Sequence, residues 1–391
     1  MLKSNRILPI IVIAQFCCTS LWFASNGIIN NIISEFNLNS EVALGYLTSA
    51  IQFGFIVGTL IFAILNISDH FSPSKVFFFS AIIAGIFNLG ILWQANSLLS
   101  LSGFRFFTGF FLAGIYPVGM KIAADYYKKG LGKSLSFLVG ALVLGTALPH
   151  LLNQFTTNFS WKLVIISTSV LAIIGGFLIF VYVPDGPYRK ANKKVDLTSF
   201  LSIFKTKKFR LVAFGYFGHM WELYTFWAFV PVILKNYNTY HQANLNISLL
   251  SFLIIGIGSI ACVIGGYLSE KITLKKTIVL VLSLSGICCL VSPIAFKFSS
   301  EILILFLLIW GMTVIMDSPL LSTLVAQNAI PDKKGTALTI VNCIGYAITI
   351  VSIQLINTML TFTDAKNVFL VLAIGPILGV IALIKPNFSG K

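Results

Sequence analysis

Residues 184–210 read PDGPYRKANKKVDLTSFLSIFKTKKFR, and this polar, basic stretch divides a chain that is otherwise strongly apolar. Of the 391 residues, 57% are hydrophobic and only 10% are charged, whereas soluble domains carry about 25% charged residues. The apolar runs on both sides are long enough for helices that cross a hydrocarbon core of about 30 Å. The composition therefore predicts an all-α integral membrane protein that contacts the lipid bilayer.

Six apolar spans precede the polar stretch and six follow it. The spans begin near Ile7, Leu44, Val76, Leu98, Ser134 and Trp161, and then near Leu211, Ile247, Thr277, Leu303, Gly335 and Val368. We therefore predict twelve transmembrane helices. A bundle of six over 1–183 and a bundle of six over 211–391 are joined by a linker over 184–210.

The formal net charge of +15 comes from lysines and arginines at helix ends and in loops. Most of them lie on the side that holds both termini and the linker, and few, such as Lys162 and Lys235, lie on the other side. This distribution places both termini and the linker in the cytoplasm, and it predicts no nucleic-acid partner. The six cysteines lie inside apolar segments without metal-ligand spacing, so we expect no metal and no cofactor.

Two loop motifs stand at equivalent places in the two halves of the chain. After the second span, SDHFSPSK contains Asp69. This stretch resembles the cytoplasmic motif of the major facilitator superfamily of secondary transporters, although the usual arginine and glycine of that motif are replaced. After the eighth span, GGYLSEKITLKK supplies Gly266, Glu270 and Lys271 at the equivalent place. Related motifs at equivalent places indicate an internal repeat. The resemblance implies two pseudo-symmetric six-helix bundles, with cytoplasmic gate motifs at these four residues.

Three full charges lie well inside the predicted spans: Arg105 in the fourth, Glu222 in the seventh and Asp317 in the tenth. A charge in lipid is costly unless it is paired or faces water. In the resembled family, the first, fourth, seventh and tenth helices line the central cavity. The resemblance thus implies that all three charges face a water-filled translocation path.

The first span adds a polar stripe when it is read as one helix from Ile7 to Ile29. Gln15, Thr19, Trp22 and Asn26 stand at i, i+4, i+7 and i+11, which is one helical face. We expect the following residues to line the substrate cavity: Gln15, Trp22, Asn26, Arg105, Tyr116, Trp221 and Tyr224.

In the seventh span, GHMWELYTFW (218–227), His219 shares a helix face with Glu222 and can hydrogen-bond its carboxylate or relay its proton. A buried carboxyl group can take up a proton near neutral pH, so we expect Glu222, Asp317 and His219 to couple transport to protons. Glu222→Gln should then abolish transport driven by a pH gradient and spare exchange. The alternative is that Glu222 or Asp317 pairs with Arg105 and only locks a gate or a helix contact.

Arg105 opens RFFTGFFLAG, which matches the resembled family's Arg-x-x-x-Gly pattern. Its planar fork of donors can bind an anionic group of a substrate, or it can pair with a facing acid. Near the cytoplasmic end of the same span, Lys121 and Asp125 stand at i and i+4, which predicts a surface ion pair.

The resemblance implies a secondary active transporter that works by alternating access, rather than an enzyme. The expected substrate is a small polar solute, with an organic anion as the leading candidate, and it is expected to be taken up by proton symport. We expect a functional monomer. A proton-antiport exporter of amphiphilic or cationic compounds stays open as the alternative. The fifth span, GALVLGTALPH, lacks the Gly-Pro signature of drug/proton antiporters. GHMWELY and MDSPLLSTLVA look like general bacterial permeases, which implies a bacterial cytoplasmic membrane.

Overall fold

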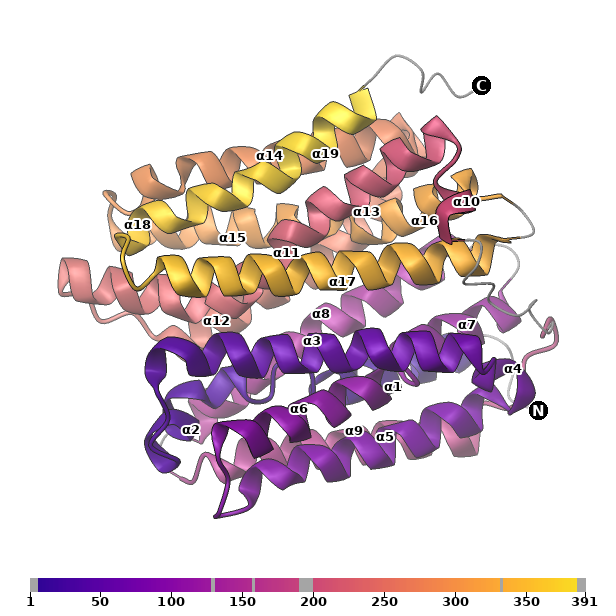
Figure 1. The fold of residues 1–391 in the computed structure, drawn as a ribbon, viewed down its shortest axis with the longest axis horizontal. Helices are drawn as coiled ribbons and strands as arrows, with labels where there is room; N and C mark the ends of the chain where they lie inside the picture. The colour runs from indigo at the N-terminus through magenta and orange to yellow at the C-terminus, as the bar shows by residue number, and fades with distance from the viewer. Residues whose placement is uncertain (1–5, 128–130, 157–158, 190–199, 331–332, 385–391) are drawn as a thin grey trace. The chain divides into compact units, whose positions relative to one another are not determined.

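The computed structural model describes residues 6–127, 131–156, 159–189, 200–330 and 333–384. Every regular element in these residues is a helix. The chain divides into two compact units, Met1–Lys194 and Val195–Lys391. The division falls inside the stretch 184–210 that the sequence analysis predicts as a linker. Within each unit the long helices lie side by side (Figure 1).

The helices of the first unit are α1 (Ile7–Thr19), η2 (Asn26–Ile28), α2 (Ile29–Glu35), α3 (Ser40–Ile64), α4 (Ile67–His70), α5 (Pro73–Leu89), η3 (Gly90–Leu92), α6 (Leu98–Leu112), α7 (Tyr116–Tyr126), α8 (Leu131–Phe155) and α9 (Lys162–Tyr182). Those of the second unit are α10 (Phe200–Ile203), α11 (Lys207–His241), α12 (Ile247–Gly256), α13 (Gly258–Ile272), α14 (Leu274–Ala295), α15 (Ser300–Met316), α16 (Ser318–Asn328), α17 (Lys334–Met359), α18 (Ala365–Val368), η6 (Phe369–Ala373) and α19 (Ile374–Ile384).

Among the described residues, ten helices are long and apolar enough to cross a membrane. They coincide with ten of the twelve predicted spans, so the prediction of an all-α membrane protein is confirmed. The first and seventh predicted spans are the exceptions. Helix α1 has only 13 residues, and α11 has 35 residues that include several polar side chains. The count of twelve and the cytoplasmic termini stay predictions.

The first predicted helix does not run unbroken to Ile29, and this expectation was wrong. Helix α1 ends at Thr19, residues 20–25 form turns, and the helical path resumes at η2 and α2. The turns contain neither proline nor glycine, so the local sequence does not require a break. Instead, the main-chain carbonyls in the turns are bound from elsewhere in the unit, as described below.

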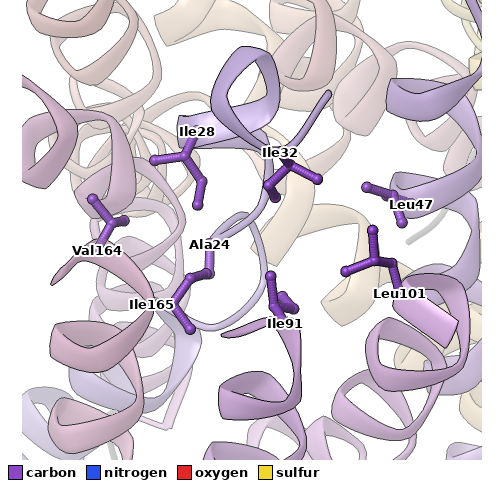
Figure 2. Close-up of a cluster of buried hydrophobic side chains, with 8 residues drawn as sticks. All are labelled: Ala24, Ile28, Ile32, Leu47, Ile91, Leu101, Val164 and Ile165. Atoms are coloured by element: carbon purple, nitrogen blue, oxygen red, sulfur yellow. The ribbon is translucent and has the colours of Figure 1, made fainter. Parts of the chain in front are cut away.

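An apolar cluster packs around this break (Figure 2). Its buried side chains come from the break, η2, α2, α3, η3, α6 and α9, and they are Ala24, Ile28, Ile32, Leu47, Ile91, Leu101, Val164 and Ile165. Because the cluster joins the break to six neighbouring elements, burial of apolar surface holds the turns in place.

Glycines permit close helix packing at equivalent places in both units. A methyl group on Gly109 of α6 would overlap the carbonyl oxygen of Ile51 on α3. In the second unit, a methyl group on Gly311 of α15 would overlap the carbonyl oxygen of Ile254 on α12. The first pair joins the second and fourth predicted spans, and the second pair joins the eighth and tenth, which are the equivalent spans of the other half. The glycine of the Arg-x-x-x-Gly pattern therefore has a packing role, and it is repeated.

The fourth and tenth spans are also interrupted alike. Helix α6 ends at Leu112 and α7 follows with Pro117 in its first turn, whereas α15 ends at Met316 and α16 follows with Pro319 in its first turn. Proline fits the first turn of a helix because its missing N–H has no intrahelical partner there. In the second unit this junction places Asp317 between two helices.

Candidate functional site

Arg105 lies on α6 with no solvent exposure. Its Nη1 donates to the carbonyl oxygen of Leu21 at 3.0 Å and to Oδ1 of Asn88 at 3.4 Å, and its Nη2 donates to the carbonyl oxygen of Trp22. Both carbonyls belong to the turns after α1, and that of Leu21 also accepts from the N–H of Ala24 at 3.4 Å. The guanidinium thus caps the broken end of the first helix.

Asn88 on α5 extends this polar contact to α9. Its Nδ2 donates to Oγ1 of Thr168 at 3.2 Å and to Oγ of Ser169 at 2.9 Å. The network therefore ties α5, α6 and α9 to the break by hydrogen bonds that are buried throughout. Substrate binding by Arg105 stays a prediction, because the hydrogen bonds described here go to the protein itself.

The predicted polar stripe of the first helix is only partly helical. Gln15 and Thr19 lie on α1, but Trp22 lies in the turns and Asn26 begins η2, so the four do not share one helix face. All four are nevertheless buried. Nδ2 of Asn26 donates to Oγ1 of Thr48 on α3 at 2.9 Å, so Asn26 meets α3 beyond the break rather than along the face of α1.

Glu222 lies on α11 with 1% of its surface exposed. Its Oε1 accepts hydrogen bonds from Oγ of Ser285 at 2.6 Å, from Nε1 of Trp310 at 2.6 Å and from Sγ of Cys289 at 3.2 Å. The donors come from α14 and α15. Sequence reasoning missed all three, because their positions relative to Glu222 depend on how distant helices pack.

His219 contacts Asp317 and not Glu222, which corrects one of the sequence-based alternatives. Its Nδ1 lies 2.9 Å from Oδ1 of Asp317, and both side chains are 1% exposed. This is the separation of an ion pair, although neither carboxylate oxygen of Asp317 accepts a hydrogen bond of ordinary geometry from the described residues. The hydroxyl of Thr313, one turn before Asp317 on α15, donates to the carbonyls of Ile309 and Trp310.

The predicted aromatic cavity residues bind other helices of their own unit. Nε1 of Trp221 donates to the carbonyl oxygen of Val371 in η6 at 3.1 Å. The hydroxyls of Tyr224 and Tyr346 lie 2.9 Å apart and join α11 to α17. In the first unit, Tyr116 is partly buried at the start of α7.

The first loop motif forms an ion pair that differs from the expected one. Lys121 binds the carboxylate of Asp69 and donates to the carbonyl oxygen of Ser68 at 2.9 Å, rather than forming the predicted pair with Asp125. Nη2 of Arg189 donates to the carbonyl oxygen of Asp69 at 3.1 Å. The motif therefore connects α4, α7 and the end of the first unit.

The second loop motif lies at the end of α13. Gly266 is partly buried, and Glu270 and Lys271 are exposed at the last turn of the helix. Its role as a gate stays a prediction.

A cavity of about 450 Å³ opens at the other end of the second unit, where α11, α14 and α17 terminate. Lys366 forms an ion pair with Asp364 there at 2.8 Å, and hydrogen bonds from Lys366 lower the pKa of Asp364. These exposed charges neutralise each other. The buried charges described above lie elsewhere in the unit.

No group of three metal-ligating side chains occurs among the described residues. The six cysteines are buried and form no disulfide.

Comparison with known proteins identifies the fold. The family model for the Major Facilitator Superfamily matches residues 11–353. Among solved structures, the proton:xylose symporter XylE has a TM-score of 0.77 at 14% identity, covering 97% of this chain and 95% of that chain. A mutant of the nucleoside transporter NupG has a TM-score of 0.73 at 14% identity, covering 98% and 100%. The human organic anion transporter MFSD10 has a TM-score of 0.74 at 14% identity, covering 98% and 100%. No curated protein sequence matches the chain.

Proposed function

Because the chain belongs to the Major Facilitator Superfamily, we propose that it is a secondary active transporter that moves a small polar solute by alternating access, coupled to protons. The similar structures are described as transporters of a sugar, a nucleoside and an organic anion. At 14% identity they support the fold and not the choice among these solutes.

The buried pair of His219 and Asp317 is the observation that carries the coupling proposal. Two titratable side chains lie 2.9 Å apart in the interior of the unit, and neither carboxylate oxygen of Asp317 accepts a hydrogen bond of ordinary geometry from the described residues. A proton that reaches Asp317 neutralises the carboxylate and removes its attraction for a charged imidazole. Protonation would then release α11 from the junction of α15 and α16.

Such a release is what coupling requires, since a ligand shifts a conformational equilibrium only by binding the two states unequally. If the proton binds one conformational state and is released from the other, the proton gradient drives the solute in one direction. Glu222 has a different place in this proposal: its three hydrogen bonds hold α11 to α14 and α15, and any proton that it takes up loosens this contact. We propose uptake by symport in a bacterial cytoplasmic membrane, by a monomer.

Transport in proteoliposomes tests the coupling. We expect the wild type to accumulate at least one radiolabelled solute from a panel of D-xylose, uridine and gluconate when the pH gradient is imposed. Asp317→Asn should keep exchange of that solute and lose accumulation. Asp364→Asn, which removes an exposed carboxylate, is the matched control and should accumulate solute normally.

Accumulation by Asp317→Asn at the wild-type rate would show that this acid is not the coupling group. Movement of the solute against the direction of proton flow would instead identify an exporter that works by antiport.

A further inference from the structure

A group of buried polar side chains in the first unit has hydrogen-bonding atoms without a partner among the described residues. The unpartnered atoms are Nε2 and Oε1 of Gln15, Oγ of Ser25, Oδ1 of Asn26, Nε2 and Oε1 of Gln52, Oγ1 of Thr146 and Nε2 of His150. Each of these residues is at most 4% exposed. We call them the amide cluster, because three of the side chains are carboxamides.

Most of the amide cluster surrounds the break in the first helix, whereas Gln15 lies one turn before the break, on α1, with its Oε1 beside Gly119 of α7. On one side, Asn26 is bonded to Thr48 of α3 at 2.9 Å, and Gln52 lies one helical turn further along α3. The ring of Phe55, on the next turn, lies 4.8 Å from that of Trp22 in the break. Because Gln52 lies between Thr48 and Phe55 on α3, its unpartnered amide is on the side of α3 that contacts the break.

Helix α8 covers the other side of the break. A methyl group on Gly145 would overlap Thr19 at the end of α1, and one on Gly27 would lie 2.8 Å from the main chain of Pro149. Thr146 and His150 directly follow Gly145 and Pro149 in the sequence. Three separate elements thus bring unpartnered polar atoms to one region of the unit.

A structural role does not account for this arrangement. Buried polar groups are nearly always hydrogen-bonded, and each one left unpaired costs a substantial part of a protein's small net stability. Carboxamides could be replaced by apolar side chains of similar size if they served only packing. Their retention together at a helix break points to a polar molecule that completes their hydrogen bonds.

The available charges narrow the chemistry of that molecule. Arg105 is the only lysine or arginine that is buried among the described residues; both of its Nη atoms donate to the protein, to two main-chain carbonyls and to Asn88, and its Nε has no partner among the described residues. The fork that would bind a carboxylate through two hydrogen bonds is therefore already used, and an anion at the amide cluster would be desolvated without that pairing, which is unfavourable. Carboxamides offer both donors and acceptors, as hydroxyl groups do.

We infer that the amide cluster is the solute subsite of the first unit, and that its ligand is a neutral, polyhydroxylated solute of the sugar or nucleoside class. This inference rests on the proposed function and replaces the organic anion that the sequence analysis favours. The charged pair of the second unit is then left for the proton, so that solute and proton bind to different units.

Matched neutral and anionic probes test the inference on the purified full-length protein. D-xylose, D-glucose and uridine are compared with D-glucuronate, which carries a carboxylate on the glucose ring. A ligand that binds the folded state raises the melting temperature, and exchange across proteoliposomes without a gradient reports transport independently of protons. We expect the melting temperature to rise with at least one neutral probe, and not with D-glucuronate.

The variant Gln52→Leu separates binding from folding. Because the Gln52 amide has no partner among the described residues, the ligand-free variant should melt at the wild-type temperature or above it, while affinity for the neutral probe falls at least tenfold. Gln15→Leu should behave in the same way. Asn96→Leu is the control: its buried amide donates to the carbonyls of Gly90 and Ile91, so it should melt lower and keep its affinity.

Each other result overturns the inference. Stabilisation or exchange only with D-glucuronate shows an anion site, and no response to any neutral probe counts against the solute class. An undiminished response in both glutamine variants shows that the amide cluster holds water only. Exchange of a neutral probe without any effect of a pH gradient refutes the proposed proton coupling and leaves this inference standing.

Discussion

Replacing Glu222 in two ways tests whether its carboxylate holds three helices together. Glu222→Gln keeps an oxygen where Oε1 accepts from Ser285 and Trp310 at 2.6 Å, whereas Glu222→Leu leaves both donors without an acceptor. Both variants remove the same acid. The difference between them therefore excludes the cost of burying a charge and compares an acceptor at this position with none.

The expected difference follows from the burial of the two donors. Ser285 and Trp310 are each 1% exposed, so water does not replace the lost acceptor. Two unpaired buried donors at about 1–3 kcal/mol each make Glu222→Leu less stable than Glu222→Gln by about 2–6 kcal/mol. The thiol of Cys289 adds little, because it is a weak donor.

Unfolding of the purified variants in the same detergent measures this difference. Combining Glu222→Leu with Trp310→Phe should recover the part that belongs to the indole, with a coupling energy of about 1–3 kcal/mol. Equal stability of the leucine and glutamine variants, or a double variant whose effects simply add, would refute the hydrogen bonds described for Glu222.

Two further predictions concern the first unit. Arg105→Lys should lower the free energy of unfolding by about 1.5–3 kcal/mol, since an ammonium group keeps the charge but lacks the fork that reaches both carbonyls of the helix break. Unchanged unfolding would show that the break is held by apolar packing alone. Gly109→Val should lower the free energy of unfolding by about 1–3 kcal/mol, because the larger side chain overlaps Ile51. Gly103→Val on the same helix, where nothing lies within 4 Å, should unfold like the wild type, and equal effects at the two glycines would contradict the close packing of α3 and α6.

The spans could be predicted from the sequence because their signal is local. Lipid cannot hydrogen-bond the main chain, so each crossing segment must be a long apolar helix that satisfies its own main-chain groups. The two exceptions are informative. Helix α1 is apolar but stops at Thr19, and α11 carries Glu222 and His219, which lower its apolar character. Polar residues at the candidate site thus weaken the signal that identifies a span.

The break after Thr19 illustrates what local reasoning cannot reach. Residues 20–25 contain no helix-breaking residue, and the spacing of Gln15 and Asn26 is that of one face of a continuous helix. The break depends on Arg105, which is far away in the sequence and supplies donors to carbonyls that a continuous helix would bond internally. The amide cluster could not be predicted from the sequence for the same reason, because its members come from three elements that meet only in the fold.

By itself, the sequence determined an all-helical membrane protein with a polar stretch near its middle and three charges inside its spans. These features depend on composition and on the helical repeat, which are properties of contiguous residues. Only the tertiary structure decided the partners of the charges: Arg105 binds carbonyls, Glu222 binds three neutral donors and Asp317 meets His219. Helical spacing sets which face a side chain occupies, but its partner depends on which helix packs against that face.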